Sequence, residues 1–336
     1  MKDSKDIRIL QKAEYYSSTE YREFVEYATR QQHSQWLHTD ASVENDLHSM
    51  LVDLSDAERH AIITVLKLFV HYELRLGTNF WAALGNSFPR AEVFRMCSVF
   101  AAMEISVHSP FYAEVNRILN LDTPEFYLAY KENPVLVERL DFLGEHCKLG
   151  KKTSVEDKLL TLATLALIEG VVLYSSFALL KSFQANGNNK IPNIVTGVDY
   201  VVVDEQLHCE GAAALFQTLM QEAELAPDEL SSVKTKIYKL ADEVKLHEFE
   251  IVQMIFEEGK LPSITDKQME HFVEGRVDLV LQYLGCGAVH KPKYNPVSEW
   301  FYSNINSPKL VDFFNRTATS YTKDWSEDKL AWSNNE

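Results

Sequence analysis

Acidic and histidine side chains inside strongly apolar stretches constrain the fold of this chain more than any other feature. In residues 201–208, Glu205 and His208 stand three positions apart, a spacing that puts both on one face of an α-helix. Glu104 and His108 repeat the pattern at a spacing of four, again on one helical face. Two further glutamates stand singly in apolar runs. The full set is Glu73, Glu104, His108, Glu169, Glu205 and His208. Four helices are therefore expected to point acids and imidazoles into a shared core.

Burying these groups together has a physical cost that metal ions can remove. An unpaired carboxylate is expensive to bury, so several in one core must share protons or bind cations. Two divalent ions would neutralise four carboxylates, and neutral imidazoles suit iron or manganese as terminal ligands. Four carboxylates and two histidines from four helices form the ligand set of a ferritin-like di-metal bundle. The sequence therefore predicts an all-α, ferritin-like helical bundle with a di-metal carboxylate site in its core.

Each of these residues alone has an ordinary explanation. An acid in an apolar helix is more often at the helix edge or paired with a base, and a lone histidine is more often a hydrogen-bonded core residue. Glu243 and His247 have the same spacing as Glu104 and His108, but they lie in a charged stretch and are expected to be solvated. A purely structural helical protein would have no reason to bury four acids, which favours the metal site.

Net charge and cysteine content argue against nucleic-acid binding and indicate the cellular location. The chain of 336 residues carries a formal net charge of −16, which argues against a nucleic-acid surface because such surfaces are net basic. The four cysteines show no C-x-x-C pairing, and the polar N-terminus has no signal peptide. These features predict reduced thiols and a cytoplasmic location. Cys209, beside a proposed ligand, is interpreted as structural because neighbouring residues point about 100° apart around a helix.

One segment is long and apolar enough to resemble a membrane span. Residues 159–180 contain a single charged side chain, Glu169. A lone glutamate at the centre of a membrane helix costs a few kcal/mol, and several Ser and Thr residues add polarity. A fully buried helix in the core of a bundle fits better, so no membrane association is expected.

Capping residues and prolines along the chain predict where long helices begin, and no sheet is expected. Ser55 and Glu58 form a capping box that opens an amphipathic helix ending near residue 84. Pro89 opens the next helix, and Pro110 should interrupt its hydrogen-bond ladder. Later helices are expected from residue 155 and over 195–219, 227–257 and 265–284. The chain is divided into an N-terminal segment (1–35), a helical di-metal domain (36–317) and a flexible tail (318–336).

With these motifs in order, the sequence resembles the small, radical-generating subunit of class I ribonucleotide reductase. The likeness runs from about Trp36 to Tyr321. It rests on a Tyr four residues past the second-helix His, on Glu followed by Gly, and on Asp-Glu-x-x-His. These motifs are His108-Ser-Pro-Phe-Tyr112, Glu169-Gly170 and Asp204-Glu205-Gln-Leu-His208, with further similarity at 295–300 and 312–314.

The resemblance implies roles that spacing alone cannot assign. Tyr112 would be oxidised to a stable tyrosyl radical, although without the family an ordinary core tyrosine would be the better interpretation. Trp36, Asp204 and His108 would link the metal site to the surface for electron transfer, with Asp204 accepting the ring N–H of His108. An apolar shell would protect the radical; its members are Leu173, Phe177 and Val201.

The same resemblance implies that the tail docks on a large catalytic subunit. Tyr321 is the candidate relay residue in this tail, with Trp325 and Trp332 as alternatives.

The chain departs from the family pattern in two places. Glu104 and His108 are separated by three residues instead of two, with Ile105 at the usual position of the Glu. An extra residue accommodated as a π-bulge, helped by Pro110, would keep Glu104 a ligand. Val203 precedes Asp204 where the family often has Arg, so the surface side of the relay is expected to differ.

The resemblance therefore implies a small subunit of ribonucleoside-diphosphate reductase. It would bind two metal ions, with iron expected and manganese or a mixed Mn/Fe pair compatible with the same ligands. A large subunit and a second copy of the chain are the expected partners. A di-iron oxygenase or oxidase of the same bundle would share the ligands without needing the Trp36–Asp204 link or a tail. A ferritin-type iron store would be a shorter chain with shell-forming surfaces.

Overall fold

A computed structural model describes residues 6–150, 153–291 and 294–305, and within these ranges the chain is helical and contains no strand. The predicted all-α bundle is confirmed. The predictions for the tail (318–336), for Tyr321, Trp325 and Trp332, and for the 312–314 motif concern residues outside the described ranges. The division into three segments stays a prediction.

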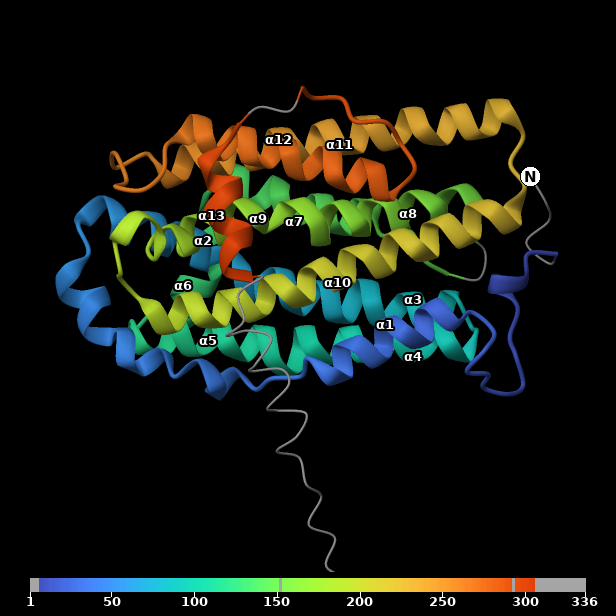
Figure 1. Cartoon of the computed structure of the whole chain (residues 1–336), viewed down its shortest axis with the longest axis horizontal. Coiled ribbons are helices and arrows are strands. Elements are labelled where there is room, and N and C mark those ends of the chain that lie inside the picture. The colour runs from blue at the N-terminus through green and yellow to red at the C-terminus, as the bar shows by residue number, and fades with distance from the viewer. Residues whose placement is uncertain (1–5, 151–152, 292–293, 306–336) are drawn as a thin grey trace, which may run out of the picture.

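Long helices run side by side through the molecule (Figure 1). Shorter 3-10 and π-helical segments join or interrupt them. The α-helices are α1 (Arg22–His33), α2 (Asp56–Arg75), α3 (Ala82–Ser87), α4 (Ala91–Met103), α5 (Ser109–Ile118), α6 (Pro124–Leu128), α7 (Pro134–His146), α8 (Val155–Leu167), α9 (Tyr174–Ser182), α10 (Pro192–Ala223), α11 (Pro227–Ile255), α12 (Asp266–Tyr283) and α13 (Pro296–Ile305). The π segments are η4 (Ser49–Asp53), η5 (Leu76–Trp81), η6 (Glu104–His108) and η8 (Ile168–Val172), and the 3-10 segments are η1 (Arg8–Leu10), η2 (His38–Ala41), η3 (Val43–Asp46), η7 (Ala129–Glu132) and η9 (Ala185–Gly187).

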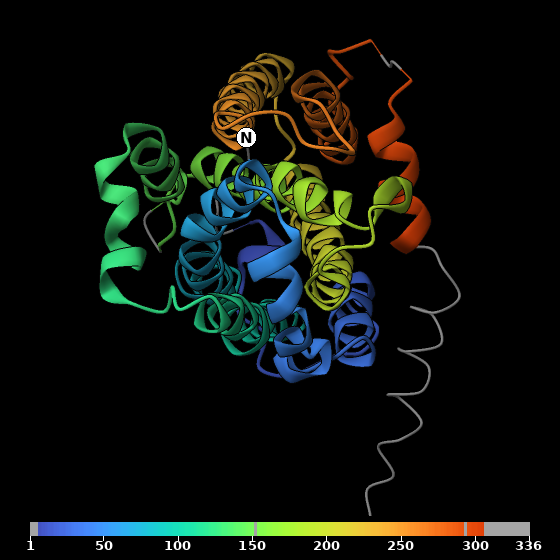
Figure 2. The ribbon, with the colours of Figure 1, turned by 90° about the vertical axis from the view of Figure 1, so that its left-hand side faces the viewer.

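The central helices are enclosed by neighbours on two sides. Helix α10 packs along α8, and α1 packs on α4 and α10. On the opposite side, α11 and α12 pack against each other and against the α8–η8–α9 segment, as the end-on view shows (Figure 2). The site-bearing helices therefore lie between two outer layers, where water is excluded.

Local sequence signals explain where the principal helices begin. The Ser55 hydroxyl accepts from the backbone N–H of Glu58 while Glu58 Oε2 accepts from the backbone N–H of Ser55 at 2.8 Å, which confirms the predicted capping box. Pro192 and Pro227 occupy the first turns of α10 and α11, where a missing N–H costs nothing. The helix predicted over 55–84 is present as α2, η5 and α3, with a π segment in its middle.

The apolar segment that resembles a membrane span forms the centre of the bundle. It is the one span within the described residues that is long and apolar enough, Val155–Ser182, and its most apolar window is entirely buried. Because its neighbours already cover it, the structure agrees with the interpretation of this segment as a core helix.

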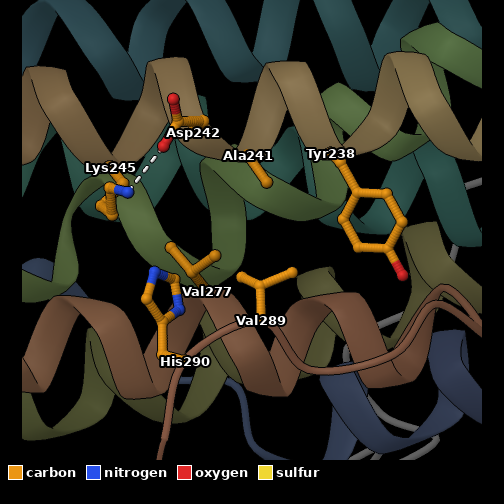
Figure 3. A pocket seen from close by; sticks show the side chains of 7 residues that line it. All are labelled: Tyr238, Ala241, Asp242, Lys245, Val277, Val289 and His290. Atoms are coloured by element: carbon orange, nitrogen blue, oxygen red, sulfur yellow. Dashed lines mark hydrogen bonds and ion pairs between the residues drawn. The ribbon is translucent and has the colours of Figure 1, made fainter.

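A surface groove lies between α11, α12 and the loop at 287–290 (Figure 3). Its polar side chains already have partners: Lys245 pairs with Asp242 at 2.6 Å, and His290 Nδ1 lies 3.0 Å from Asp278. Tyr238 OH accepts from the backbone N–H of Gly287 at 2.9 Å. The polar side chains of the groove are therefore engaged with one another or with neighbouring residues.

Candidate metal centre

The structure brings all six predicted ligands together in two overlapping clusters. Glu104 and Glu205 belong to both clusters. The first cluster comprises Glu73, Glu104, His108 and Glu205, and the second comprises Glu104, Glu169, Glu205 and His208. In each cluster the potential ligand atoms lie within 4.8 Å of one another, and every residue is buried. This arrangement has the form of two metal positions with two carboxylates between them.

Each histidine directs its Nδ1 atom toward the shared carboxylates. His108 Nδ1 lies 3.0 Å from Glu104 and 3.2 Å from Glu205. His208 Nδ1 lies 2.6 Å from Glu104 and 3.3 Å from Glu205. Both Nδ1 atoms are therefore available to an ion placed among the carboxylate oxygens.

The hydrogen-bond state of the carboxylates supports a cation site. Both oxygens of Glu73, both of Glu205 and Oε2 of Glu169 are buried without a hydrogen-bond partner. Buried carboxylate oxygens are ordinarily satisfied, and leaving several unsatisfied is costly. Two divalent ions would satisfy them, so the residues present fit a metal pair.

In the absence of cations, burial and mutual repulsion favour protons on Glu73, Glu169 and both histidines of this cluster. Burial, followed by the negative charge of Glu205, raises the pKa of both Glu73 and Glu169 well above the ordinary value of a glutamate. Burial acts to lower the pKa of His208, but Glu104 and Glu205 outweigh it and raise that pKa to about 9. Protons thus occupy the cluster where metal ions would otherwise supply the positive charge.

Three of the four site-bearing helices carry a π segment at the site itself. The extra residue between Glu104 and His108 is accommodated in η6, where the backbone N–H and the hydroxyl of Ser109 both donate to the Glu104 carbonyl. This confirms the predicted π-bulge, which is followed directly by Pro110. The π segment η5, just after Glu73, and η8, which carries Glu169, were not predicted. Such segments often sit at functional sites.

The second ring nitrogen of His108, Nε2, contacts Asp204 of the predicted relay. This nitrogen lies 3.2 Å from Asp204 Oδ2, which also accepts from the indole N–H of Trp36 at 2.8 Å. All three side chains are fully buried. The structure therefore brings Trp36, Asp204 and His108 together as one hydrogen-bonded row.

Gln31, in α1, is a site residue that sequence reasoning missed. Its amide N–H donates to Asp204 Oδ1 at 2.7 Å, and its carbonyl oxygen lies 3.1 Å from His208 Nε2. Gln31 thus fixes the orientation of the His208 ring and of Asp204, the residue that contacts His108. Val203, which precedes Asp204, has no side-chain donor. The amide of Gln31 donates to Asp204 Oδ1 instead. The sequence offered no signal, since Gln31 lies in a polar amphipathic stretch.

Trp81, in η5, was also missed. Its indole N–H donates to Glu169 Oε1 at 2.6 Å, and its ring packs edge-on against Phe100 and His208. A tryptophan in an apolar stretch has the pattern of an ordinary core residue, so nothing in the sequence indicated that Trp81 contacts a ligand.

Tyr112 lies in a closed aromatic pocket. It is fully buried, and its hydroxyl has no hydrogen-bond partner. Its ring stacks on Phe69 with centroids 4.2 Å apart, and Phe69 stacks in turn on Phe177 at 5.7 Å. Leu173 and Val201 are buried in the same core. Phe69, which was not among the predicted shell residues, provides the most direct cover of the ring.

One sequence-based expectation is wrong. His247, expected to be solvated, is buried, and its ring packs edge-on against Phe142 of α7, whereas Glu243 is exposed as expected. His247 lies on a buried face of α11, although the residues around it in the sequence are mostly charged. The next residue, Glu248, is also buried and forms an ion pair with Arg139 of α7. Helix α7 covers this face, and its packing could not be read from the local pattern.

Comparison with known proteins agrees with the site. The family described as "Ribonucleotide reductase, small chain" matches residues 13–296. The probable ribonucleoside-diphosphate reductase small subunit of Invertebrate iridescent virus 3 is 24% identical over 305 residues, covering 87% of this chain and 80% of the relative. The ribonucleoside-diphosphate reductase subunit beta of Halalkalibacterium halodurans is 26% identical, covering 80% and 77%.

Solved structures share the fold. The dimanganese(II)-NrdF of Streptococcus sanguinis superposes with a TM-score of 0.73 at 20% identity, covering 86% of this chain and 99% of that one. The ribonucleotide reductase R2 subunit from Clostridium botulinum gives a TM-score of 0.70 at 18% identity, covering 88% of each. From the family match, which spans most of its length, this chain belongs to the ribonucleotide reductase small-chain family.

Proposed function

We propose that this chain is the metal-bearing small subunit of a ribonucleoside-diphosphate reductase and that it generates a radical on Tyr112. The observation that carries the proposal is the pair of overlapping clusters that share Glu104 and Glu205. Glu73 and His108 would complete the position next to the relay, and Glu169 with His208 the other. A ligand set of this kind is the one found in ferritin-like di-metal proteins.

A redox-active metal pair held here would supply, with an oxidant, the capacity to take one electron from a neighbouring side chain. Tyr112 would give that electron, and its phenolic proton would pass to a base at the site. Burial, followed by Glu73, raises the pKa of Tyr112 well above its ordinary value, so the phenol would keep its proton until it is oxidised. The Phe69 and Phe177 rings keep water and reductants from the radical.

The row of His108, Asp204 and Trp36 would carry electrons between the site and a large catalytic subunit. Asp204 accepts from both ring systems and so holds them in fixed orientation. Gln31 holds the second oxygen of Asp204. The tail at 318–336, with Tyr321 as the relay residue, would complete the path in the assembled enzyme.

Iron is the expected metal, and manganese or a mixed pair suits the same carboxylate and imidazole donors. The structural neighbour from Streptococcus sanguinis is named as a dimanganese protein. The chain would act in the cytoplasm, where its four cysteines, which are free in the structure, would stay reduced.

The chain would act as a homodimer. Leu74 of α2, Phe94 of α4 and Ile105 of η6 are between 40% and 49% exposed, and η6 contacts both of the other helices. Exposed apolar side chains gathered on one side favour burial in an interface. Sedimentation should give a dimer, and Phe94→Glu should shift it toward the monomer; a monomeric parent would contradict this assignment.

Electron paramagnetic resonance tests the radical proposal directly. The protein would be loaded with ferrous iron without oxygen and then exposed to air, beside a Tyr112→Phe variant with equal metal content. A tyrosyl signal in the parent that is absent from the variant is the expected result. Oxygen consumption without any radical would instead favour the oxidase alternative, and no metal uptake would refute the six-ligand site.

A further inference from the structure

A second fully buried tyrosine, Tyr174, lies close to Tyr112 through aromatic contacts. Phe177, which stacks on the Phe69 ring beside Tyr112, also packs edge-on against Tyr174 at 5.6 Å between centroids. Tyr174 is completely buried, and its hydroxyl has no hydrogen-bond partner. Two oxidisable side chains therefore flank the same pair of phenylalanines.

The aromatic contacts continue from Tyr174 to the end of the described chain. Its ring lies 5.8 Å from Phe301, which in turn lies 5.1 Å from Tyr302, a half-buried residue of α13. Electrons tunnel efficiently between aromatic rings in contact, so this row is a second potential route from Tyr112 toward solvent. An oxidising equivalent that followed it would leave the site without reaching the Trp36 relay.

Arg276 of α12 contacts both tyrosines of this route. Its guanidinium carbon lies 3.6 Å from the centroid of the Tyr174 ring, and its Nη1 donates to Tyr302 OH at 2.9 Å. The side chain is buried, with further hydrogen bonds to the Gly170 carbonyl and to Gln206. A buried arginine fixed by this many partners keeps its charge and its position.

The charge of Arg276 opposes oxidation of Tyr174. Because Tyr174 OH has no acceptor for its proton, removal of an electron would first leave a positive charge on the ring. That charge would lie directly beneath a guanidinium, in a medium of low dielectric constant where like charges repel strongly. The Tyr112 ring, by contrast, stacks on the uncharged ring of Phe69.

We propose that Arg276 closes this second electron-transfer route through Tyr174 and Tyr302 and so confines the oxidising equivalent to Tyr112 and the Trp36 relay. The inference rests on the proposed function. In the reaction that Arg276 prevents, the Tyr112 radical would gain an electron from Tyr174 and regain its proton from the base at the site, which leaves Tyr174 as a radical cation. The new radical would then be reduced through Tyr302 by a one-electron reductant in solution.

The experiment follows the decay of the Tyr112 signal in metal-loaded protein in the presence of ascorbate. Arg276→Gln removes the charge but keeps an amide that can donate to the Gly170 carbonyl, and it should shorten the radical lifetime. Adding Tyr174→Phe should restore the wild-type lifetime, because the route then lacks its first oxidisable residue. Arg276→Lys retains a cation and should behave as the wild type. Metal content is measured for every variant.

The proposal would be overturned by an unchanged lifetime in fully metallated Arg276→Gln, or by a shortened lifetime that Tyr174→Phe does not restore. Tyr174→Phe alone gives a test that does not disturb Arg276. It should leave the lifetime unchanged, and a longer lifetime would mean that the route is open despite Arg276. If the wild-type protein binds metal and forms no Tyr112 radical, the proposed function fails, which is a different outcome from a radical insensitive to Arg276.

Discussion

The indole N–H of Trp81 donates to Oε1 of Glu169 over 2.6 Å, tying an aromatic residue of η5 to a proposed ligand of η8. The contact leaves Glu169 Oε2 free for an ion. Because outer partners of this kind hold ligands in position, their loss typically reduces metal affinity.

Trp81→Phe should therefore lower metal affinity by about 10- to 100-fold at the position held by Glu169 and His208. Titration of the apoprotein with ferrous iron should show one site weakened more than the other. Trp300→Phe, the same change in α13, which carries none of the six ligands, serves as the control. Equal weakening of both sites would point to general destabilisation.

Gln31 satisfies polar groups of two residues at once, so an apolar replacement should be destabilising. Gln31→Met would leave Asp204 Oδ1 and His208 Nε2 without their partners and should cost roughly 1–3 kcal/mol in the free energy of unfolding. Gln32→Met, on the exposed side of α1, should change it by no more than about 0.5 kcal/mol. Urea unfolding of the two apoproteins measures the difference, and similar values would contradict the assigned role.

Trp36→Phe should separate radical formation from radical use. The phenyl ring preserves packing but cannot donate to Asp204 or be readily oxidised. We expect normal metal content and a normal Tyr112 signal, with nucleotide reduction in the presence of a large subunit reduced to background. Substantial remaining activity would exclude Trp36 from the relay.

The buried Arg139–Glu248 pair links α7 to α11 and, through Tyr72, to the helix that carries Glu73. Removing one partner leaves a buried charge, so Glu248→Gln should destabilise the protein by about 3–5 kcal/mol. The exposed pair of Lys236 and Glu156 is the matched control, and Glu156→Gln should cost at most about 1 kcal/mol. Equal effects in denaturant unfolding would contradict the burial argument.

Metal removal should lower the unfolding temperature, since ions that bind only the folded chain stabilise it by mass action. Free metal at 100 times its dissociation constant contributes about 2.7 kcal/mol. Calorimetry with and without a chelator measures this difference, and His208→Ala should reduce it, because one of the two positions then lacks its histidine. An unfolding temperature that does not depend on metal would argue against a site in the cluster.

The sequence by itself was sufficient for the all-α fold and for the six residues of the cluster. Each depends on local periodicity: the spacing of Glu205 and His208 places both on one helical face wherever the helix lies. The extra residue between Glu104 and His108 could likewise be counted, so the π segment there was predictable. The π segments near Glu73 and Glu169 produce no abnormal spacing, and only the structure revealed them.

Tertiary structure alone decided which side chains support the cluster. Trp81 lies 88 residues from Glu169 in the chain, and Gln31 lies 177 residues from His208. Arg276 reaches Tyr174 from yet another helix. The local sequence fixes which face of a helix a residue occupies, but its partner depends on how distant helices pack. That packing minimises the free energy of the whole core, so no local pattern of residues could have predicted these contacts.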